Sequence, residues 1–206
     1  MNSESTTKIV IVGAGPSGLL LAYKLMQSIS SQRYDITLLE QRPEFRTYTA
    51  EQSRTFPIAL QNRGWNALPT VVQDTLSSQG VWTDGVCLHG KRGKPPRIIP
   101  REKKNLSIDR NRVTLTLLEA LTKLKDQGDS KHSLTICFDS TVESMDFAKR
   151  EIEVVQITKQ TVRKTLSYDF LVAADGGNSK YQGEDDWGGI NQGRQNIIGR
   201  HIAILS

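Results

Sequence analysis

The chain has 206 residues, of which 37% are hydrophobic, and a formal net charge of +5 at pH 7. This length is enough to bury a sizeable core, and no apolar run approaches the ~20 residues of a membrane-spanning helix. The N-terminus lacks the basic and apolar segments of a secretory signal. Together these features predict a cytoplasmic protein without a membrane span.

The positive charge is concentrated between residues 91 and 104, where seven basic residues stand against the single Glu102, a local charge of +6. This segment has no aromatic residue that could stack on a base, so no nucleic acid is expected as a partner. We interpret it as part of a solvated hairpin, in which two strands at residues 81–89 and 97–100 flank the basic turn. Attraction of an anionic cofactor such as NADPH is the alternative.

A glycine-rich fingerprint follows the first strand of the chain. Residues 9–12 form a β-branched apolar run typical of a buried parallel strand, and they lead directly into Gly13-Ala14-Gly15-Pro16-Ser17-Gly18. Gly13 permits a tight turn, Gly15 lets a pyrophosphate approach the backbone, and Gly18 lets the next helix pack closely on the strand. That helix is expected over residues 16–29, and its N-terminus favours negative charge.

An acidic residue completes the fingerprint. Residues 35–40 are predicted to form the second parallel strand, which ends in Glu40, 22 residues after Gly18. A carboxylate at this distance binds the ribose of a dinucleotide. The combination predicts a Rossmann-like βαβ unit, and a glycine-rich turn in some other α/β protein is the less favoured alternative.

The middle of the chain supplies a loop and a helix. Residues 51–68 mix an extended start with a short helix near residues 62–68, as expected of a loop that lies along a cofactor. Asp109 is predicted to cap a helix over residues 110–127. Arg110 opposes the dipole of that helix, so it either faces an anion or is a solvated surface arginine.

From residue 133 the pattern changes to short strands, expected at residues 134–138, 142–147, 152–158, 161–166 and 168–174. Short turns between them predict an antiparallel meander that caps the parallel sheet. The last strand delivers Asp175-Gly176 to the edge at which open α/β sheets bind ligands. No residues have metal-ligand spacing, so no metal is expected, and Cys87 and Cys137 are interpreted as reduced core thiols.

Four motifs, in this order, resemble those of the FAD-dependent aromatic-ring monooxygenases. They are the glycine fingerprint, Leu39-Glu40-Gln41-Arg42, Ser107-Ile108-Asp109-Arg110 before a helix, and residues 171–179 around Asp175-Gly176. Residues 53–68 are most similar to the kynurenine 3-monooxygenase branch of that family.

The resemblance implies an α/β fold. It comprises a Rossmann-like FAD-binding domain, with a parallel sheet and an antiparallel β-meander, and part of a β-rich substrate domain. The implied cofactors are FAD and NADPH. In enzymes of that family NADPH reduces the flavin, and dioxygen supplies the oxygen atom that enters a small aromatic substrate. Because the cofactor carries this chemistry, no catalytic acid or base is assigned.

The resemblance also implies which residues bind the cofactor. The glycine fingerprint would contact the pyrophosphate, Glu40 would hold the adenosine ribose, and Arg110 would face the pyrophosphate or the flavin. Asp175-Gly176 matches a fingerprint used for both FAD and NADPH. The full implied set is Gly13, Ala14, Gly15, Pro16, Ser17, Gly18, Glu40, Gln41, Arg42, Ala59, Arg110, Val142, Asp175 and Gly176, with Ala59 and Val142 acting largely through their backbones.

The chain also departs from the family pattern. Asp84 follows Ser78-Gln79-Gly80, where kynurenine-hydroxylating relatives carry an Arg that holds the amino-acid substrate, and an Asp there would repel the same carboxylate. The Arg expected shortly after Asp175-Gly176 is absent. We therefore expect a truncated member. Residues 1–75 and 105–180 would form the FAD/NAD(P)-binding domain, 76–104 would begin the inserted substrate-domain sheet, and 181–206 would be an atypical tail, ordered or disordered.

The expected function is that of an FAD-binding, NAD(P)H-dependent monooxygenase of a small aromatic compound. Two alternatives remain open. One is an NAD(P)-linked dehydrogenase. The other is a non-catalytic dinucleotide-binding fragment that associates with another chain through apolar core surface left exposed.

Overall fold

The computed structural model describes residues 6–47, 55–90, 95–128, 130–157, 160–176 and 202–204. It divides into two compact units, the first made of residues 1–48 and 121–206 and the second of residues 49–120. Among the helices within the described ranges, none combines the length and the apolar character needed to cross a bilayer.

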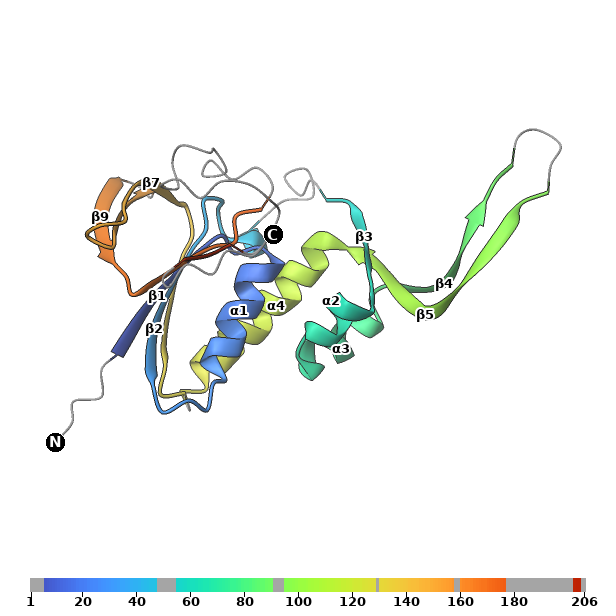
Figure 1. Ribbon diagram of the computed structural model, residues 1–206, viewed down its shortest axis with the longest axis horizontal. Helices are drawn as coiled ribbons and strands as arrows, with labels where there is room; N and C mark the ends of the chain where they lie inside the picture. The colour runs from blue at the N-terminus through green and yellow to red at the C-terminus, as the bar shows by residue number, and fades with distance from the viewer. Residues whose placement is uncertain are drawn as a thin grey trace. The chain divides into compact units, whose positions relative to one another are not determined.

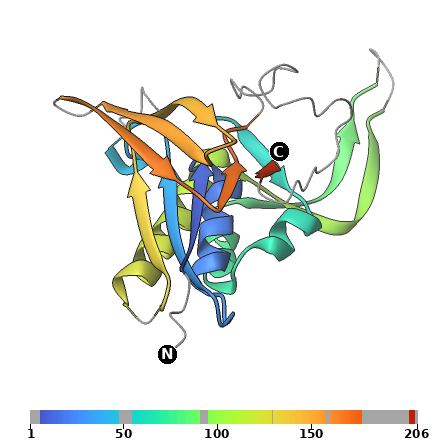
Figure 2. The same ribbon diagram turned by 60° about the vertical axis from the view of Figure 1, so that its left-hand side comes forward.

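A parallel sheet forms the centre of the first unit (Figures 1 and 2). Its order is β11-β10-β1-β2-β6, and every neighbouring pair is parallel. The chain passes from β1 to β2 on one side, whereas β10 lies on the other side, so the order of the strands reverses beside β1. Ligands of open α/β sheets bind at such a point. The bounds are β1 Thr6–Val12, β2 Arg33–Leu39, β6 Ser133–Cys137, β10 Phe170–Ala173 and β11 Ile202–Ile204.

Helix α1 (Pro16–Met26) connects β1 to β2 and packs on the sheet (Figure 1). Its buried side chains recur at helical spacing and include Leu19, Ala22, Tyr23 and Met26. The helix ends three residues before the expected position 29. Ser28 explains the early end, because its hydroxyl oxygen accepts the Ser30 N–H in a local turn that competes with the helix.

An antiparallel sheet of three strands, β7 (Ser140–Asp146), β8 (Glu151–Ile157) and β9 (Thr161–Ser167), packs against the parallel sheet. The predicted meander is confirmed for these strands. It is wrong for residues 134–138, because β6 pairs in parallel with β2. Alternation of apolar residues predicts a strand but does not identify its neighbour. The core between the two sheets contains Val10, Leu39, Val142, Ile152, Val154, Tyr168 and Leu171.

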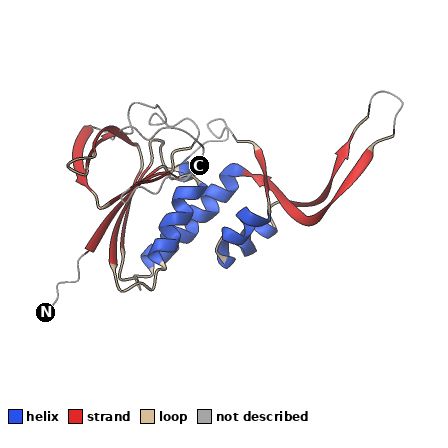
Figure 3. Ribbon diagram, viewed as in Figure 1, coloured by secondary structure: helices blue, strands red, loops and turns tan. Residues whose placement is uncertain are grey.

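The second unit is built on an antiparallel sheet of order β3-β5-β4 (Figure 3). Strands β4 (Val81–Leu88) and β5 (Arg97–Asp109) form a long hairpin that extends beyond helices α2 (Asn62–Ala67) and α3 (Thr70–Ser77). The expected pair of strands is confirmed, although β5 is much longer than residues 97–100. The turn at residues 91–94 lies outside the described residues.

The shorter elements of the chain complete the two units. They are η1 (Phe45–Thr47), β3 (Pro57–Leu60), α2 (Asn62–Ala67) and α3 (Thr70–Ser77). Trp82 of β4 holds the helices on one face of the sheet, because its indole Nε1 donates to Ser77 O at 3.3 Å and its ring contacts Trp65 edge-on. Helix α4 (Arg110–Asp126) follows β5, and the unit boundary falls within it.

Neither cysteine is a fully buried core thiol, so the expectation is wrong for Cys87 and only partly right for Cys137. Cys87 is exposed on β4, because a two-stranded hairpin has no layer to cover it. Cys137 is partly buried at the end of β6, and this burial raises the pKa of its thiol.

Candidate dinucleotide site

Gly13 joins three segments of the first unit. Its backbone φ is +105°, a value that side chains disfavour, and its N–H donates to Leu39 O at 2.7 Å. A Cβ on Gly13 would lie 2.5 Å from Ala174 O and 2.8 Å from the Cα of Asp175. Only glycine therefore lets the end of β1 touch both the end of β2 and the segment after β10.

The fingerprint turns directly into α1. A Cβ on Gly18 would lie 2.0 Å from Gly13 O, so the first turn of the helix needs glycine for its close approach to the strand. Gly15 is the N-cap in extended conformation, and Pro16 occupies the first helical turn. No side chain caps this end and its first turn has no acid. The N–H groups of Ser17 and Gly18 belong to the set that a helix start leaves without an intrahelical partner.

Glu40 lies directly after β2 and is 3% exposed. Its Oε2 accepts the Ala14 N–H at 2.9 Å. Its Oε1 accepts both the backbone N–H of Arg42, at 3.1 Å, and the side-chain Nε–H of Arg42, at 2.9 Å. A carboxylate oxygen has two lone pairs, so Oε2 retains the capacity to accept one further hydrogen bond.

Arg42 lies beside Glu40 and forms an ion pair with it. Its side chain is 45% exposed and its guanidinium carbon lies 5.2 Å from the centre of the Phe45 ring. The backbone of this segment is held by the turn before β7, since Asp139 N donates to Arg42 O and Ser140 N donates to Glu40 O. Gln41, the remaining member of the motif, is exposed.

Asp175 and Gly176 lie at the carboxyl edge of β10, next to Gly13. Ala174 N donates to Val12 O at 2.7 Å, which continues the pairing of β10 with β1 to the end of both strands. Gly176 has a φ of +85° and open space around the position of a Cβ. The structure thus brings the two fingerprints, 160 residues apart in sequence, to one edge of the sheet.

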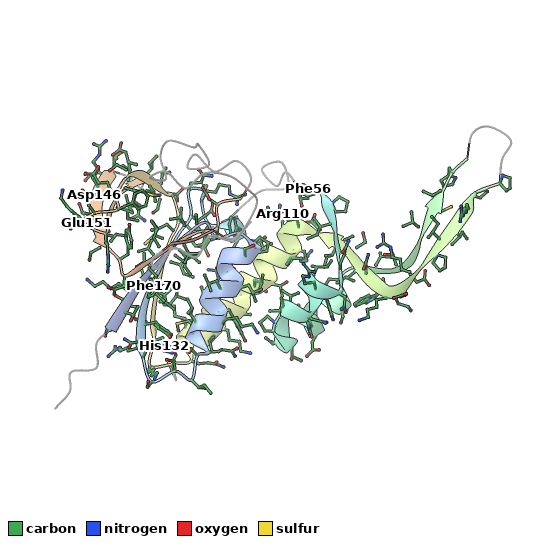
Figure 4. All side chains as sticks on the ribbon, in the orientation of Figure 1. Phe56, Arg110, His132, Asp146, Glu151 and Phe170 are labelled. Carbon is green, nitrogen blue, oxygen red and sulfur yellow. The ribbon has the colours of Figure 1, made fainter. Side chains whose placement is uncertain are left out.

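Ala59 and Arg110 belong to the second unit. Ala59 is exposed on β3 and pairs with Ser107 of β5. Arg110 begins α4, and its N–H donates to Phe56 O at 3.2 Å, so the two labelled residues lie side by side in Figure 4. The assignment of both residues to FAD stays a prediction.

Asp109 is the N-cap that the sequence predicts. Its Oδ1 accepts the N–H groups of Asn111, at 2.7 Å, and Arg112, at 3.2 Å, together with the hydroxyl of Thr55 at 2.6 Å. Partial burial raises the pKa of Asp109, but these hydrogen bonds and the charge of Arg112 outweigh it, so the pKa lies below its usual value.

Val142 contributes a core side chain that is 4% exposed, next to an irregularity in the β7–β8 register between Val142 and Ser144. Its backbone contact with FAD remains a prediction.

The sequence does not reveal that the turn at Asp139 and Ser140 holds the backbone of Glu40 and Arg42. Short polar residues between two strands gave no signal of this role beyond that of a turn.

Comparison with known proteins agrees with this geometry. Residues 11–75 match a family model described as an NAD(P)-binding Rossmann-like domain. A kynurenine 3-monooxygenase of Stenotrophomonas maltophilia is 30% identical over all of this chain and 42% of its own length. The chain is therefore similar to these monooxygenases over its whole length. A second relative, the kynurenine 3-monooxygenase of Candida albicans, is 29% identical over 87% of this chain and 38% of its own length.

Two solved structures share the fold. A p-nitrophenol 4-monooxygenase from Pseudomonas putida superposes with a TM-score of 0.61 at 20% identity, covering 89% of this chain and 44% of its own. A 2-methyl-3-hydroxypyridine-5-carboxylic acid oxygenase superposes with a TM-score of 0.60 at 19% identity, covering 85% of this chain and 41% of its own. The chain thus spans about two-fifths of the length of the relatives and structures named here.

Proposed function

We propose that this chain forms the FAD-binding part of an NAD(P)H-dependent monooxygenase that hydroxylates a small aromatic compound. The observation that carries the proposal is the junction at Gly13, where the glycine loop, the acid Glu40 and Asp175-Gly176 meet at one sheet edge. The names of the curated relatives support the type of reaction.

The residues at this junction fit FAD. The uncapped start of α1 offers backbone N–H groups to a pyrophosphate, and Oε2 of Glu40 can accept a bond from a ribose hydroxyl. Bound FAD would supply the redox chemistry: one aromatic C–H, O2, NAD(P)H and a proton give a phenolic C–OH, NAD(P)+ and water. The protein holds and orients the cofactor.

The domain division is also part of this proposal. Residues 1–75 and 105–180 would form the cofactor-binding domain, and residues 76–104 would begin the substrate domain. An amino-acid carboxylate is disfavoured in the substrate because of Asp84, so we propose an aromatic compound other than kynurenine itself.

The test is retention of FAD by the purified chain after incubation and desalting, read from the visible spectrum. We expect about one flavin per chain, bleaching of the flavin by NADPH without oxygen, and at least a tenfold loss of affinity in Glu40→Ala, since charge-assisted bonds contribute about 1.5–3 kcal/mol. Glu119→Ala, which removes an exposed acid of α4, is the control. A colourless chain that behaves like its Glu40→Ala variant would contradict the proposal, and NAD(P)+ binding without flavin would favour a dehydrogenase.

One observation favours the second candidate, a non-catalytic fragment that associates with another chain. Among the described residues, the β4–β5 hairpin exposes five aliphatic side chains, those of Val81, Val86, Leu88, Ile98 and Ile99. Such a surface promotes association. Light scattering after size-exclusion chromatography would show a species larger than one chain that Ile98→Asp reduces, whereas a monomer would exclude this candidate.

A further inference from the structure

Asp139 turns the chain between β6 and β7 in a backbone conformation that side chains disfavour. Its φ is +53°, and in the described part of the chain Arg150, with a φ of +56°, is the one other residue besides glycine that has a positive φ. Left-handed backbone is costly for most residues, and asparagine and aspartate tolerate it best. Such a conformation persists where the surrounding structure holds it. The contacts of the turn therefore indicate its role.

The turn at Asp139 directs two consecutive N–H groups to one segment. Asp139 N donates to Arg42 O at 3.1 Å, and Ser140 N donates to Glu40 O at 2.8 Å. The φ and ψ angles of Asp139 set the relative direction of these two N–H groups, because they are the torsions between the two peptide planes. Consecutive N–H groups point to opposite sides of an extended strand, whereas a turn conformation directs them to the same side. The left-handed conformation of Asp139 thus lets both hydrogen bonds reach the segment that follows β2.

The antiparallel sheet holds the turn from its other side. Ile157 N, at the end of β8, donates to Asp139 O at 2.8 Å. The carbonyl oxygen of Phe138 accepts the Ser140 hydroxyl at 2.9 Å and the side-chain amide of Gln156 at 3.2 Å. Ser140 is 2% exposed, so water does not compete for these groups. The turn is therefore anchored to β8 and holds the segment after β2.

That segment carries the acid of the candidate site. Both backbone groups of Glu40 are bonded at this turn, since its N–H donates to Cys137 O at 2.9 Å and its carbonyl oxygen accepts Ser140 N. Its carboxylate oxygen Oε2 accepts the Ala14 N–H at 2.9 Å. A carboxylate that binds the glycine loop and a ribose hydroxyl at once tolerates little displacement, because hydrogen bonds weaken outside a narrow range of distance and angle. A shift of the backbone at Glu40 would therefore weaken the bond to the nucleotide.

We infer that Asp139 is a positioning residue for the nucleotide: its left-handed backbone places the Glu40 carboxylate to accept a hydrogen bond from the adenosine ribose. This inference rests on the proposed function and deepens it, because it gives the antiparallel sheet a role in ligand selection. The backbone conformation is what matters, and the Asp139 carboxylate is dispensable. Glycine and asparagine, which adopt this φ readily, should replace Asp139, whereas a β-branched residue should not.

The experiment measures how well the full chain distinguishes ADP from 2′-deoxy-ADP, which differ only in the hydroxyl that a ribose-binding carboxylate contacts. Dissociation constants are measured by calorimetry. We expect the wild type to prefer ADP at least about tenfold, the contribution of one hydrogen bond to a charged group. Asp139→Val should lose most of this preference through weaker ADP binding, with 2′-deoxy-ADP unaffected. Asp139→Gly and Asp139→Asn should keep it. Asp139→Ala, which is less strained, should show a partial loss and replaces the valine variant if that one does not fold.

Arg150→Val is the matched control, because it puts valine at the other left-handed position. Arg150 lies in the turn between β7 and β8, where its carbonyl oxygen accepts the Tyr168 N–H at 3.0 Å. Both valine variants should unfold at lower urea concentrations than the wild type, but only Asp139→Val should lose the preference for ADP. Equal preferences in the two variants would overturn the inference.

Two further results would also overturn it: loss of the preference in Asp139→Gly, and a wild-type chain that binds ADP and 2′-deoxy-ADP equally. Retention of FAD tests the proposed function separately. A wild-type chain that prefers ADP but does not retain FAD would count against the FAD proposal and still support the role of Asp139.

Discussion

The carboxylate oxygen Oε2 of Glu40 lies 2.9 Å from the backbone nitrogen of Ala14 and accepts its hydrogen bond. The acid that ends β2 is thereby tied to the glycine loop that ends β1, inside the protein and independently of any ligand. The same carboxylate holds Arg42 through a second oxygen. Glu40 therefore stabilises the fold as well as the candidate site.

Replacing this carboxylate should weaken the chain even without FAD. Glu40→Gln puts an amide NH2 against donors, so at least one buried donor loses its acceptor, and we expect the free energy of unfolding to fall by about 1–3 kcal/mol. Urea denaturation followed by circular dichroism measures this loss. Glu119→Gln, at an exposed site, should change little. Equal stabilities for both variants would show that the Ala14 and Arg42 bonds contribute nothing to folding.

Gly13→Ala should be far more damaging than an alanine at another glycine of positive φ. Gly128, just beyond α4, has a φ of +70° with nothing within 4 Å of a Cβ, so alanine there costs about 1–2 kcal/mol of backbone strain. At Gly13 the methyl group also meets Ala174 O at 2.5 Å, and we expect roughly 2 kcal/mol more, or loss of cooperative unfolding. Similar urea midpoints for the two variants would contradict the close contact between Gly13 and the Ala174 oxygen.

The cap at Asp109 makes the start of α4 sensitive to pH. Asp109→Ala should lower the free energy of unfolding by about 1 kcal/mol at pH 7. Since the folded-state pKa of Asp109 is below its unfolded value of about 3.9, this contribution is complete above that value and is lost as pH falls through the folded-state pKa.

The pH test compares wild type and Asp109→Ala by urea denaturation from neutral to acidic pH. Their difference in unfolding free energy should shrink on acidification. Asn caps a helix without titrating, so the difference between Asp109→Asn and Asp109→Ala should not change with pH. A difference that grows as the pH falls would contradict the assignment of Asp109 as a charged cap.

His132 is a structural side chain of the first unit (Figure 4). It is 6% exposed, its Nδ1 accepts the Tyr34 N–H at 3.0 Å, and its Nε2 lies 3.0 Å from Ser28 O, to which it donates. His132→Ala removes both partners and a ring stacked on Tyr34, so we expect a loss of about 2 kcal/mol or more in unfolding free energy. His89→Ala, on the exposed hairpin, should be neutral, and a neutral His132→Ala would refute this role.

The sequence predicts the start of this fold well because β1, α1 and β2 follow one another and their signals are local. The acid at position 40 could be placed for the same reason. Helix α3 was missed because Thr70, Val71 and Val72 favour a strand when taken alone. In the structure, burial of Val72 and Leu76 outweighs that preference.

The site was less predictable than the fold. Gly13 signals a turn, but its contact with Ala174 depends on β10 lying beside β1, which periodicity does not reveal. Asn105 gave no signal at all, since an Asn in a strand is ordinary until its burial is known, and until its Nδ2 is seen to have no hydrogen-bond partner among the described residues. Properties that depend on neighbours distant in sequence require the folded chain.

The contact between Gly13 and Ala174 also sets an order of events during synthesis. The glycine loop leaves the ribosome early, but the strand that flanks it on the other side is made 160 residues later. At about 5–20 residues per second, β1 waits on the order of ten to thirty seconds for β10, with one edge unpaired. The first motif of the chain is thus among the last to reach its final surroundings, and a nascent chain stalled before β10 should leave this loop open to proteolysis.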